Sequence, residues 1–219
     1  TLTGTNTYTG TTTIVAGVLA LTGTGSISNS TVIDVQSGAT LDVSGTTSTY
    51  SIASGQTLKG KGTVQGGLIL ASGSTLAPGA SPGIMIQAGD LTLDDADLAI
   101  DIWGDLGAGD ATAGHDQIQF TSGDLALLNE PVITVDLNGF NPTVNNSYII
   151  LTGYANSVTS GFNGTVAVNN GVDFTTAGKS FQIDYNTGNI ALTVIPEPAT
   201  FGLVLAFGAA AVIRRRRIG

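Results

Sequence analysis

The stretch Val32-Ile-Asp-Val35-Gln-Ser-Gly38-Ala-Thr-Leu41-Asp-Val43 decides the fold class. Apolar and polar residues alternate on both sides of Gly38, and strict alternation is the pattern of a β-strand with one buried face. A glycine between two such runs favours a tight turn, because it tolerates backbone conformations that other residues avoid. The segment therefore predicts two short strands joined by a turn.

A glycine followed within three residues by leucine recurs along the first part of the chain. The glycines of this phrase are spaced 21, 17, 18 and 16 residues apart, at Gly17, Gly38, Gly55, Gly73 and Gly89. A unit of that size cannot bury its own apolar face, so successive units must stack. We therefore expect an all-β fold, a parallel β-helix or solenoid, with residues 1–90 as its regular repeats.

Residues 91–194 keep the strand pattern but lose the regular spacing. Strand-like stretches separated by Gly, Asn and Asp turns occur at 98–103, 117–120, 132–137, 148–151, 165–168, 181–185 and 190–194. They are expected to continue the solenoid with a less regular capping region, and a closing β-sandwich is the alternative. The larger core residues expected here are Trp103, Phe120, Phe140, Phe162, Phe174 and Phe181.

Composition and charge exclude several classes of protein. The chain has 219 residues, of which 42% are hydrophobic and 11% charged, and its 31 glycines disfavour both a disordered chain and a helix-rich enzyme. Sixteen acidic residues against seven basic ones give a net charge of −9, so binding to nucleic acid is excluded. The absence of cysteine removes disulfides, thiolate metal sites and cysteine nucleophiles.

The last residues, 195–219, differ in composition from the rest. The prolines of Pro196-Glu197-Pro198 cannot continue a strand ladder, and the uncharged run 199–213 that follows predicts one C-terminal transmembrane helix. The arginines at its end place that end in the cytoplasm. A buried or amphipathic surface helix is disfavoured, because the run has no polar face. The expected anchor comprises Phe201, Leu203, Val204, Leu205, Phe207, Val212 and Ile213, and the basic cluster is Arg214, Arg215, Arg216 and Arg217.

This order of Pro-Glu-Pro, short apolar helix and arginine cluster resembles the PEP-CTERM sorting signal of Gram-negative bacteria. The resemblance implies that an exosortase, a membrane protease, recognises the protein while the helix holds it in the inner membrane. It further implies cleavage near Pro196-Glu197-Pro198 and release to the cell surface or its polysaccharide matrix. Ile195 departs from the valine that is commoner in the family.

The opening segment from Leu2 to Leu19 is similar to the autotransporter-associated β-strand repeat, and the phrase Leu76-Ala-Pro78-Gly79-Ala-Ser-Pro82-Gly83 is common in proteins that carry it. This resemblance implies a right-handed parallel β-helix on the bacterial surface. The sequence lacks the membrane barrel of a true autotransporter, so self-translocation is not implied. Because strand pattern begins at once, we expect a secretory signal upstream of Thr1.

Motifs for catalysis are weak, and no catalytic residue, metal or cofactor is predicted. The stretch Gly79-Ala-Ser81-Pro82-Gly83 matches a nucleophile elbow, but Pro82 has no N–H for an oxyanion hole. The stretch 55–61 resembles a phosphate-binding loop, but Gly62 stands where a hydroxyl should meet magnesium. A role at a turn or strand edge is favoured for His115, the only histidine.

Eight aspartates lie between residues 90 and 116, and a solvated acidic face is favoured over a calcium site for them. No EF-hand loop and no glycine-rich calcium nonapeptide is present. The aspartates are Asp90, Asp94, Asp95, Asp97, Asp101, Asp105, Asp110 and Asp116.

The sequence therefore predicts an exported, non-catalytic surface or matrix protein, a β-solenoid spacer or adhesin-like module. Its expected partners are an exosortase-type membrane protease, the inner membrane before processing, and surface polysaccharide. The alternative is an extracellular carbohydrate-active enzyme or a glycan-binding protein on the same scaffold, because a glycoside hydrolase needs only two convergent carboxylates. A groove with two such aspartates of shifted pKa favours the enzyme, and a smooth acidic flank favours the spacer.

Overall fold

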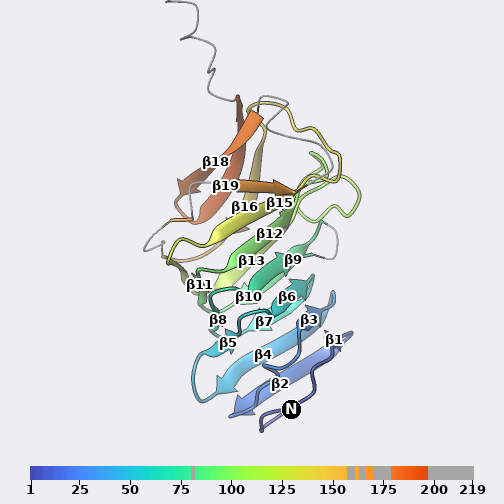
Figure 1. The fold of residues 1–219 in the computed structure, drawn as a ribbon, viewed down its shortest axis with the longest axis vertical. Helices are drawn as coiled ribbons and strands as arrows, with labels where there is room; N and C mark the ends of the chain where they lie inside the picture. Colours follow the sequence, from blue (N-terminus) through green and yellow to red (C-terminus); the bar gives the residue numbers. More distant parts are fainter. Residues whose placement is uncertain (80–81, 157–160, 163–165, 170–178, 197–219) are drawn as a thin grey trace, which may run out of the picture.

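The computed structural model describes residues 1–79, 82–156, 161–162, 166–169 and 179–196. Within these ranges the chain forms nineteen β-strands in three sheets. Figure 1 shows the strands stacked along the long axis of the molecule, from β1 and β2 near the N-terminus to β18 at the opposite end.

The seven-stranded sheet is parallel throughout. In spatial order it contains β1 (Thr12–Ile14), β3 (Val32–Val35), β6 (Thr57–Gly60), β9 (Thr75–Pro78), β12 (Asp97–Asp101), β15 (Val132–Asp136) and β17 (Val166–Asn169). The four-stranded sheet is also parallel, and it contains β5 (Tyr50–Ile52), β8 (Leu68–Leu70), β11 (Leu91–Asp94) and β14 (Leu125–Leu128).

The eight-stranded sheet changes direction at its C-terminal end. Its parallel part contains β2 (Gly17–Gly23), β4 (Ala39–Thr46), β7 (Thr63–Gln65), β10 (Ile84–Ala88), β13 (Gln117–Ser122) and β16 (Ser147–Thr152). The hairpin of β18 (Lys179–Asn186) and β19 (Asn189–Pro196) then adds two antiparallel strands beside β16. A sequence-based choice between solenoid and sandwich therefore meets a parallel stack that ends in an antiparallel hairpin.

From β3 to β14 the chain visits the three sheets in the same order again and again. We call each passage through the three sheets a rung. Parallel strands that pair only with the rungs before and after them are expected when no single unit can close its own core. The described residues thus form an all-β structure of three mostly parallel sheets, which fits the β-helix class.

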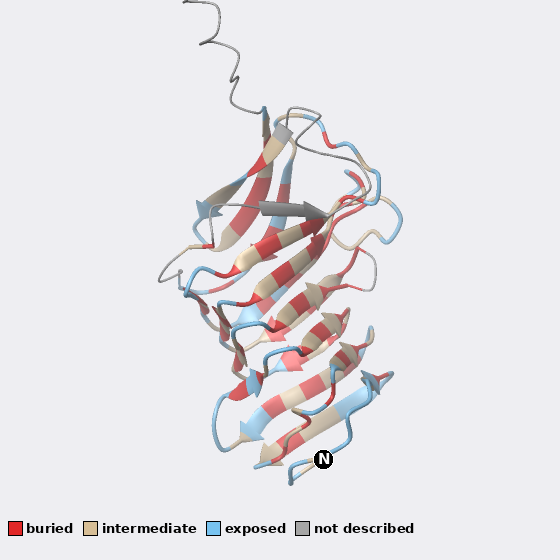
Figure 2. Ribbon diagram, in the orientation of Figure 1, coloured by how far each residue is buried: buried red, intermediate tan, exposed pale blue. Residues whose placement is uncertain are grey.

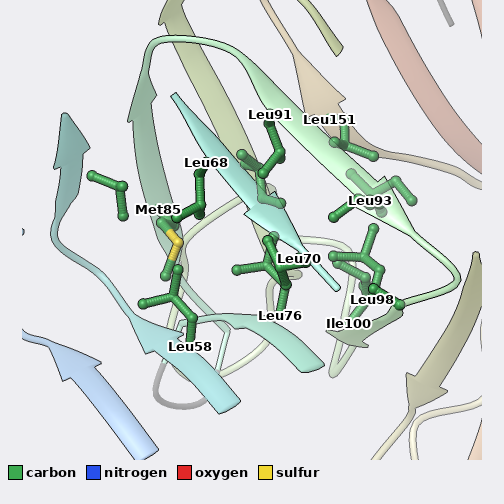
Figure 3. Close-up of a cluster of buried hydrophobic side chains, with 14 of the residues drawn as sticks. Leu58, Leu68, Leu70, Leu76, Met85, Leu91, Leu93, Leu98, Ile100 and Leu151 are labelled. Carbon is green, nitrogen blue, oxygen red and sulfur yellow. The ribbon is translucent and has the colours of Figure 1, made fainter. Parts of the chain in front are cut away.

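The interior is built from aliphatic side chains that stack from rung to rung. In the seven-stranded sheet the register aligns five buried residues, Ile33, Leu58, Leu76, Leu98 and Ile133. Figure 2 shows the alternation of buried and less buried residues along these strands. Figure 3 shows side chains from the three sheets, among them Leu70, Leu76 and Met85, that point into one interior.

The rungs are longer than the spacing of the glycine phrase. Leu41 pairs with Val64, 23 residues later, and Gln87 pairs with Phe120, 33 residues later. The phrase glycines lie at different corners of the stack, since Gly38 precedes a strand of the eight-stranded sheet and Gly55 precedes one of the seven-stranded sheet. The longer rungs reflect an insertion, residues 102–116, between β12 and β13.

One corner of the stack requires glycine in successive rungs. Gly66, Gly89 and Gly123 have φ angles of +105°, +142° and +97°, which side chains other than glycine rarely adopt. A Cβ atom on Gly89 would lie 2.6 Å from the carbonyl carbon of Gly66, and one on Gly123 would lie 2.2 Å from that of Gly89. The backbones of neighbouring rungs touch here, so no side chain fits between them.

The expected aromatic core residues have different outcomes. Phe120, Phe162 and Phe181 are buried, and Phe140 is partly buried against the core. Trp103 is half-buried in the insertion. Phe174 lies outside the described residues.

The fold class predicted from the sequence, a β-helix followed by one C-terminal transmembrane helix, needs correction. The described residues form three mostly parallel β-sheets, and none of their segments is a helix long and apolar enough to cross a membrane. Up to Pro196 the apolar residues alternate with polar ones in strands of three to eight residues, which leaves no continuous apolar helix. The expected helix 199–213, with Glu197, Pro198 and the arginine cluster, lies outside the described residues.

Candidate functional site

The insertion 102–116 folds back on itself beside the stack. A bridge joins Ile102 to His115, and the Trp103 N–H donates to the Gly114 carbonyl oxygen at 2.8 Å. At the tip, Asp110 Oδ1 accepts hydrogen bonds from the N–H and the hydroxyl of Thr112, at 2.9 and 2.7 Å. These bonds hold the loop in a defined shape, and long loops on a rigid scaffold are common places for binding.

The insertion and the start of β16 form a surface depression of about 410 Å³. A volume of this size lies within the usual range of sites for small ligands, roughly 300–1,000 Å³. Its lining side chains are polar or aromatic, and they are Asp105, His115, Asn145, Asn146, Ser147 and Tyr148. We call this feature the β16 depression.

Asp105 is held in place by two donors from the opposite wall. The Tyr148 hydroxyl donates to Asp105 Oδ1 at 2.6 Å, and the Asn146 amide donates to the same oxygen at 2.8 Å. Hydrogen bonds to a carboxylate are short and strong. The carboxylate is therefore oriented, and neither bond uses its second oxygen, Oδ2.

The buried His115 packs against the same wall. Its ring lies edge-on to the Tyr148 ring, with 5.4 Å between centroids, and its Nε2 lies 3.3 Å from the Ile149 carbonyl oxygen. Nδ1 is buried and has no hydrogen-bond partner among the described residues. Burial lowers the pKa of the His115 ring, although the bond to Ile149 opposes the shift, so the ring is neutral at pH 7.

Tyr148 joins the depression to the core of the molecule. Its ring also lies edge-on to Phe181 of β18, with 6.5 Å between centroids. Burial, and the hydrogen bond to Asp105, raise the pKa of the Tyr148 hydroxyl above its usual value. The hydroxyl therefore stays protonated and remains a donor to Asp105.

A second group of carboxyls, Asp101 and Asp116, lies outside the depression. Asp116 is 2% exposed, and its two oxygens accept the main-chain N–H of Gly83 at 2.7 Å and that of Asp101 at 2.9 Å. Burial raises the pKa of Asp116 to about 8, against the hydrogen bonds that favour its ionised form. Burial and the nearby charge of Asp136 raise the pKa of Asp101 to about 6. The pair fastens two segments together.

The other aspartates of the acid-rich stretch have separate partners. Asp94 accepts from the Asn129 amide, Asp95 from the Ser72 hydroxyl, and Asp97 from the Thr134 hydroxyl. In the ranges that the structure covers, no three His, Asp or Glu side chains gather in a way that could hold a metal ion. The stretch therefore supplies local bonds at successive rungs.

Two weak sequence motifs and the sorting motif fall as follows. The stretch 55–62 covers a turn, β6 and the bend before β7, and a strand follows it where a phosphate-binding loop needs a helix. Ser81 lies outside the described residues. Pro196 ends β19 and pairs with Lys179, and the rest of the motif lies beyond the described part.

Sequence reasoning missed most of the depression. It singled out Asp105 only as a member of the acidic stretch and His115 only as a turn residue, and it passed over Asn145, Asn146 and Tyr148. The lost spacing after Asp90 was the available signal, because a longer rung must place its extra residues in a loop.

Neither a scan of protein-family models nor a search of curated proteins finds a match for this chain.

Proposed function

We propose that this protein is an exported, non-catalytic surface or matrix protein in which the stacked rungs serve as a spacer or adhesin-like module. The observation that supports this most is the unbroken series of parallel pairings in the seven-stranded sheet, from β1 to β17. In such a stack each rung contacts only its neighbours, so the stack gains length and lateral surface with each rung.

The outward positions of the sheets support a lateral contact role. Thr57 pairs with Thr75 on the outside of the seven-stranded sheet, and Thr40 pairs with Thr63 in the eight-stranded sheet. Their hydroxyl groups are both donors and acceptors. A surface lined by such groups suits contact with hydroxyl-rich matrix polymers.

The arrangement of Asp101 and Asp116 favours the non-catalytic role over the hydrolase alternative. A hydrolase needs two carboxyls that reach a glycosidic bond from a groove. Asp116 is buried and both its oxygens are engaged by main-chain N–H groups. Its position suits a structural fastener.

The sequence 195–219 supports the proposed route to the surface. We expect an exosortase-type protease at the inner membrane to act near Pro196-Glu197-Pro198. The β19 strand ends at Pro196, so cleavage there would leave the sheet intact. The released product would then reach the cell surface or its matrix.

Replacing Pro196, Glu197 and Pro198 with alanine tests this route. Wild-type protein recovered from the surface of the producing cells should have a C-terminus near Glu197 by intact mass and peptide mapping, without the arginine cluster. The triple variant should remain uncleaved in the membrane fraction. A matched control changes Glu130 and Pro131 to alanine and should be processed normally. Recovery of wild-type protein at the surface with its full tail would contradict the proposal.

A further inference from the structure

We infer that the β16 depression binds a segment of neutral, hydroxyl-rich polysaccharide. The inference rests on the proposed surface function, to which it adds a site and a ligand class. It is carried by the contacts of Asp105, His115, Asn146 and Tyr148 described above.

Asp105 provides an oriented acceptor for sugar hydroxyls. Tyr148 and Asn146 both donate to Oδ1. A carboxylate has about four lone-pair positions, so Oδ2 retains capacity to accept hydrogen bonds. Adjacent hydroxyl groups of a sugar ring are donors with the spacing to meet one carboxylate. Because the carboxylate is already fixed, little conformational entropy is lost on binding.

The charge of the depression selects against anionic ligands. The described residues that line it include Asp105 but no lysine or arginine. His115 also supplies no positive charge at pH 7, since burial keeps its ring neutral. An anionic sugar would face the Asp105 carboxylate without a compensating cation, which is costly. A neutral sugar meets no such cost.

The remaining lining matches both faces of a sugar ring. Asn145, Asn146 and Ser147 offer amide and hydroxyl groups for the polar edges, and Tyr148 and His115 contribute ring atoms for contact with C–H groups. A volume of about 410 Å³ accommodates a short saccharide segment. The depression is open at the surface, so a longer chain can pass through it.

The test measures saccharide binding to the full chain by equilibrium dialysis. The probes are labelled hexasaccharides of neutral β-glucan, α-glucan and mannan, with a hexauronate as the anionic counterpart. We expect saturable binding of at least one neutral probe and weaker binding of the hexauronate. The variant Asp105→Asn should weaken binding about tenfold or more, as expected when a hydrogen bond to a charged group is lost.

Asp124→Asn is the matched control. Asp124 is also an exposed aspartate whose Oδ1 accepts an asparagine amide, from Asn156 at 3.0 Å, but it lies outside the depression. This variant should bind like wild type. A second test variant, Asn145→Gly, removes a lining amide at a position with φ of +75°, which glycine adopts without strain. It should weaken binding several-fold with an unchanged circular dichroism spectrum.

Three results would overturn the inference: no saturable binding of any neutral probe up to millimolar concentration, tighter binding of the hexauronate, or equal affinities in the Asp105, Asn145 and Asp124 variants. Failure of the inference and of the proposed function are distinguishable. A protein that reaches the surface but binds no saccharide contradicts only the inference. A protein that binds the probe through Asp105 but stays inside the cell contradicts only the proposed function.

Discussion

Asp116 shows at the scale of one residue how this fold uses a buried acid. Its carboxyl joins the main chain at Gly83 to that at Asp101, which leads into the insertion. Burial outweighs these bonds and raises the pKa of the carboxyl to about 8, so the folded protein holds a proton that the unfolded chain releases near pH 4. Stability is then linked to pH at this residue.

The free energy of unfolding should fall as pH rises from about 4 to about 8. The folded pKa values of Asp101 and Asp116, about 6 and about 8, lie above the unfolded value, so their contribution is complete below pH 4 and is lost through this window. The total loss should be on the order of a few kcal/mol in urea unfolding. Asp116→Asn should flatten the upper part of the slope, whereas Asp42→Asn should preserve it. A slope of opposite sign would show that the main-chain hydrogen bonds dominate.

At the scale of the strand, alternation of apolar and polar residues predicted the elements well. The expected strand 132–137 is observed as Val132–Asp136, and the expected strand 117–120 as Gln117–Ser122. Local alternation determines which residues face inward, and that is enough to locate a strand. It does not determine which strands pair. The antiparallel hairpin at β18 and β19 depends on contacts between distant segments.

The β16 depression was beyond sequence analysis for the same reason. His115 and Tyr148 are in ring contact across 33 residues of sequence, and their meeting depends on the register between β13 and β16. The Asp105 hydrogen bond to Tyr148 spans 43 residues. No local pattern encodes such separations. Only the loss of regular spacing indicated that this rung was different.

The column of stacked aliphatic side chains should carry much of the stability of the seven-stranded sheet. Leu76 is 1% exposed and lies between Leu58 and Leu98 in the column. Leu76→Ala should lower the free energy of unfolding by about 2–5 kcal/mol, through lost burial and a residual cavity. Thr75→Ala changes the neighbouring outward residue and should cost about 0.5 kcal/mol or less. Similar losses in the two variants by urea unfolding would argue against the column.

At the scale of the whole molecule, the two ends of the stack differ. Val15 and Val18 are exposed on the first rungs, and the hairpin of β18 and β19 covers the edge of β16 at the other end. An uncovered strand edge is a template for pairing with another chain. The hairpin therefore protects the parallel rungs from unwanted association.

Leu192→Asp should open this hairpin. Leu192 is fully buried between Tyr148 and Ile183, and a charge there is unpaired, at a cost of about 3 kcal/mol or more. Hydrogen exchange should show lost protection in β18 and β19 but not in β6 and β7, and light scattering should show concentration-dependent association. The control Thr193→Asp changes a half-buried neighbour and should remain monomeric and protected. Loss of protection in all rungs together would show that the stack unfolds as one unit.

The repeated pairing pattern also bears on how such a protein changes length over evolution. Duplication of one rung in the gene would add a layer about 4.8 Å thick that pairs with its neighbours as the existing layers do. The glycine corner at Gly66, Gly89 and Gly123 would simply gain another member. The insertion and the terminal hairpin would keep their own neighbours. The molecule can therefore act as a ruler whose length varies by whole layers while its functional end is inherited unchanged.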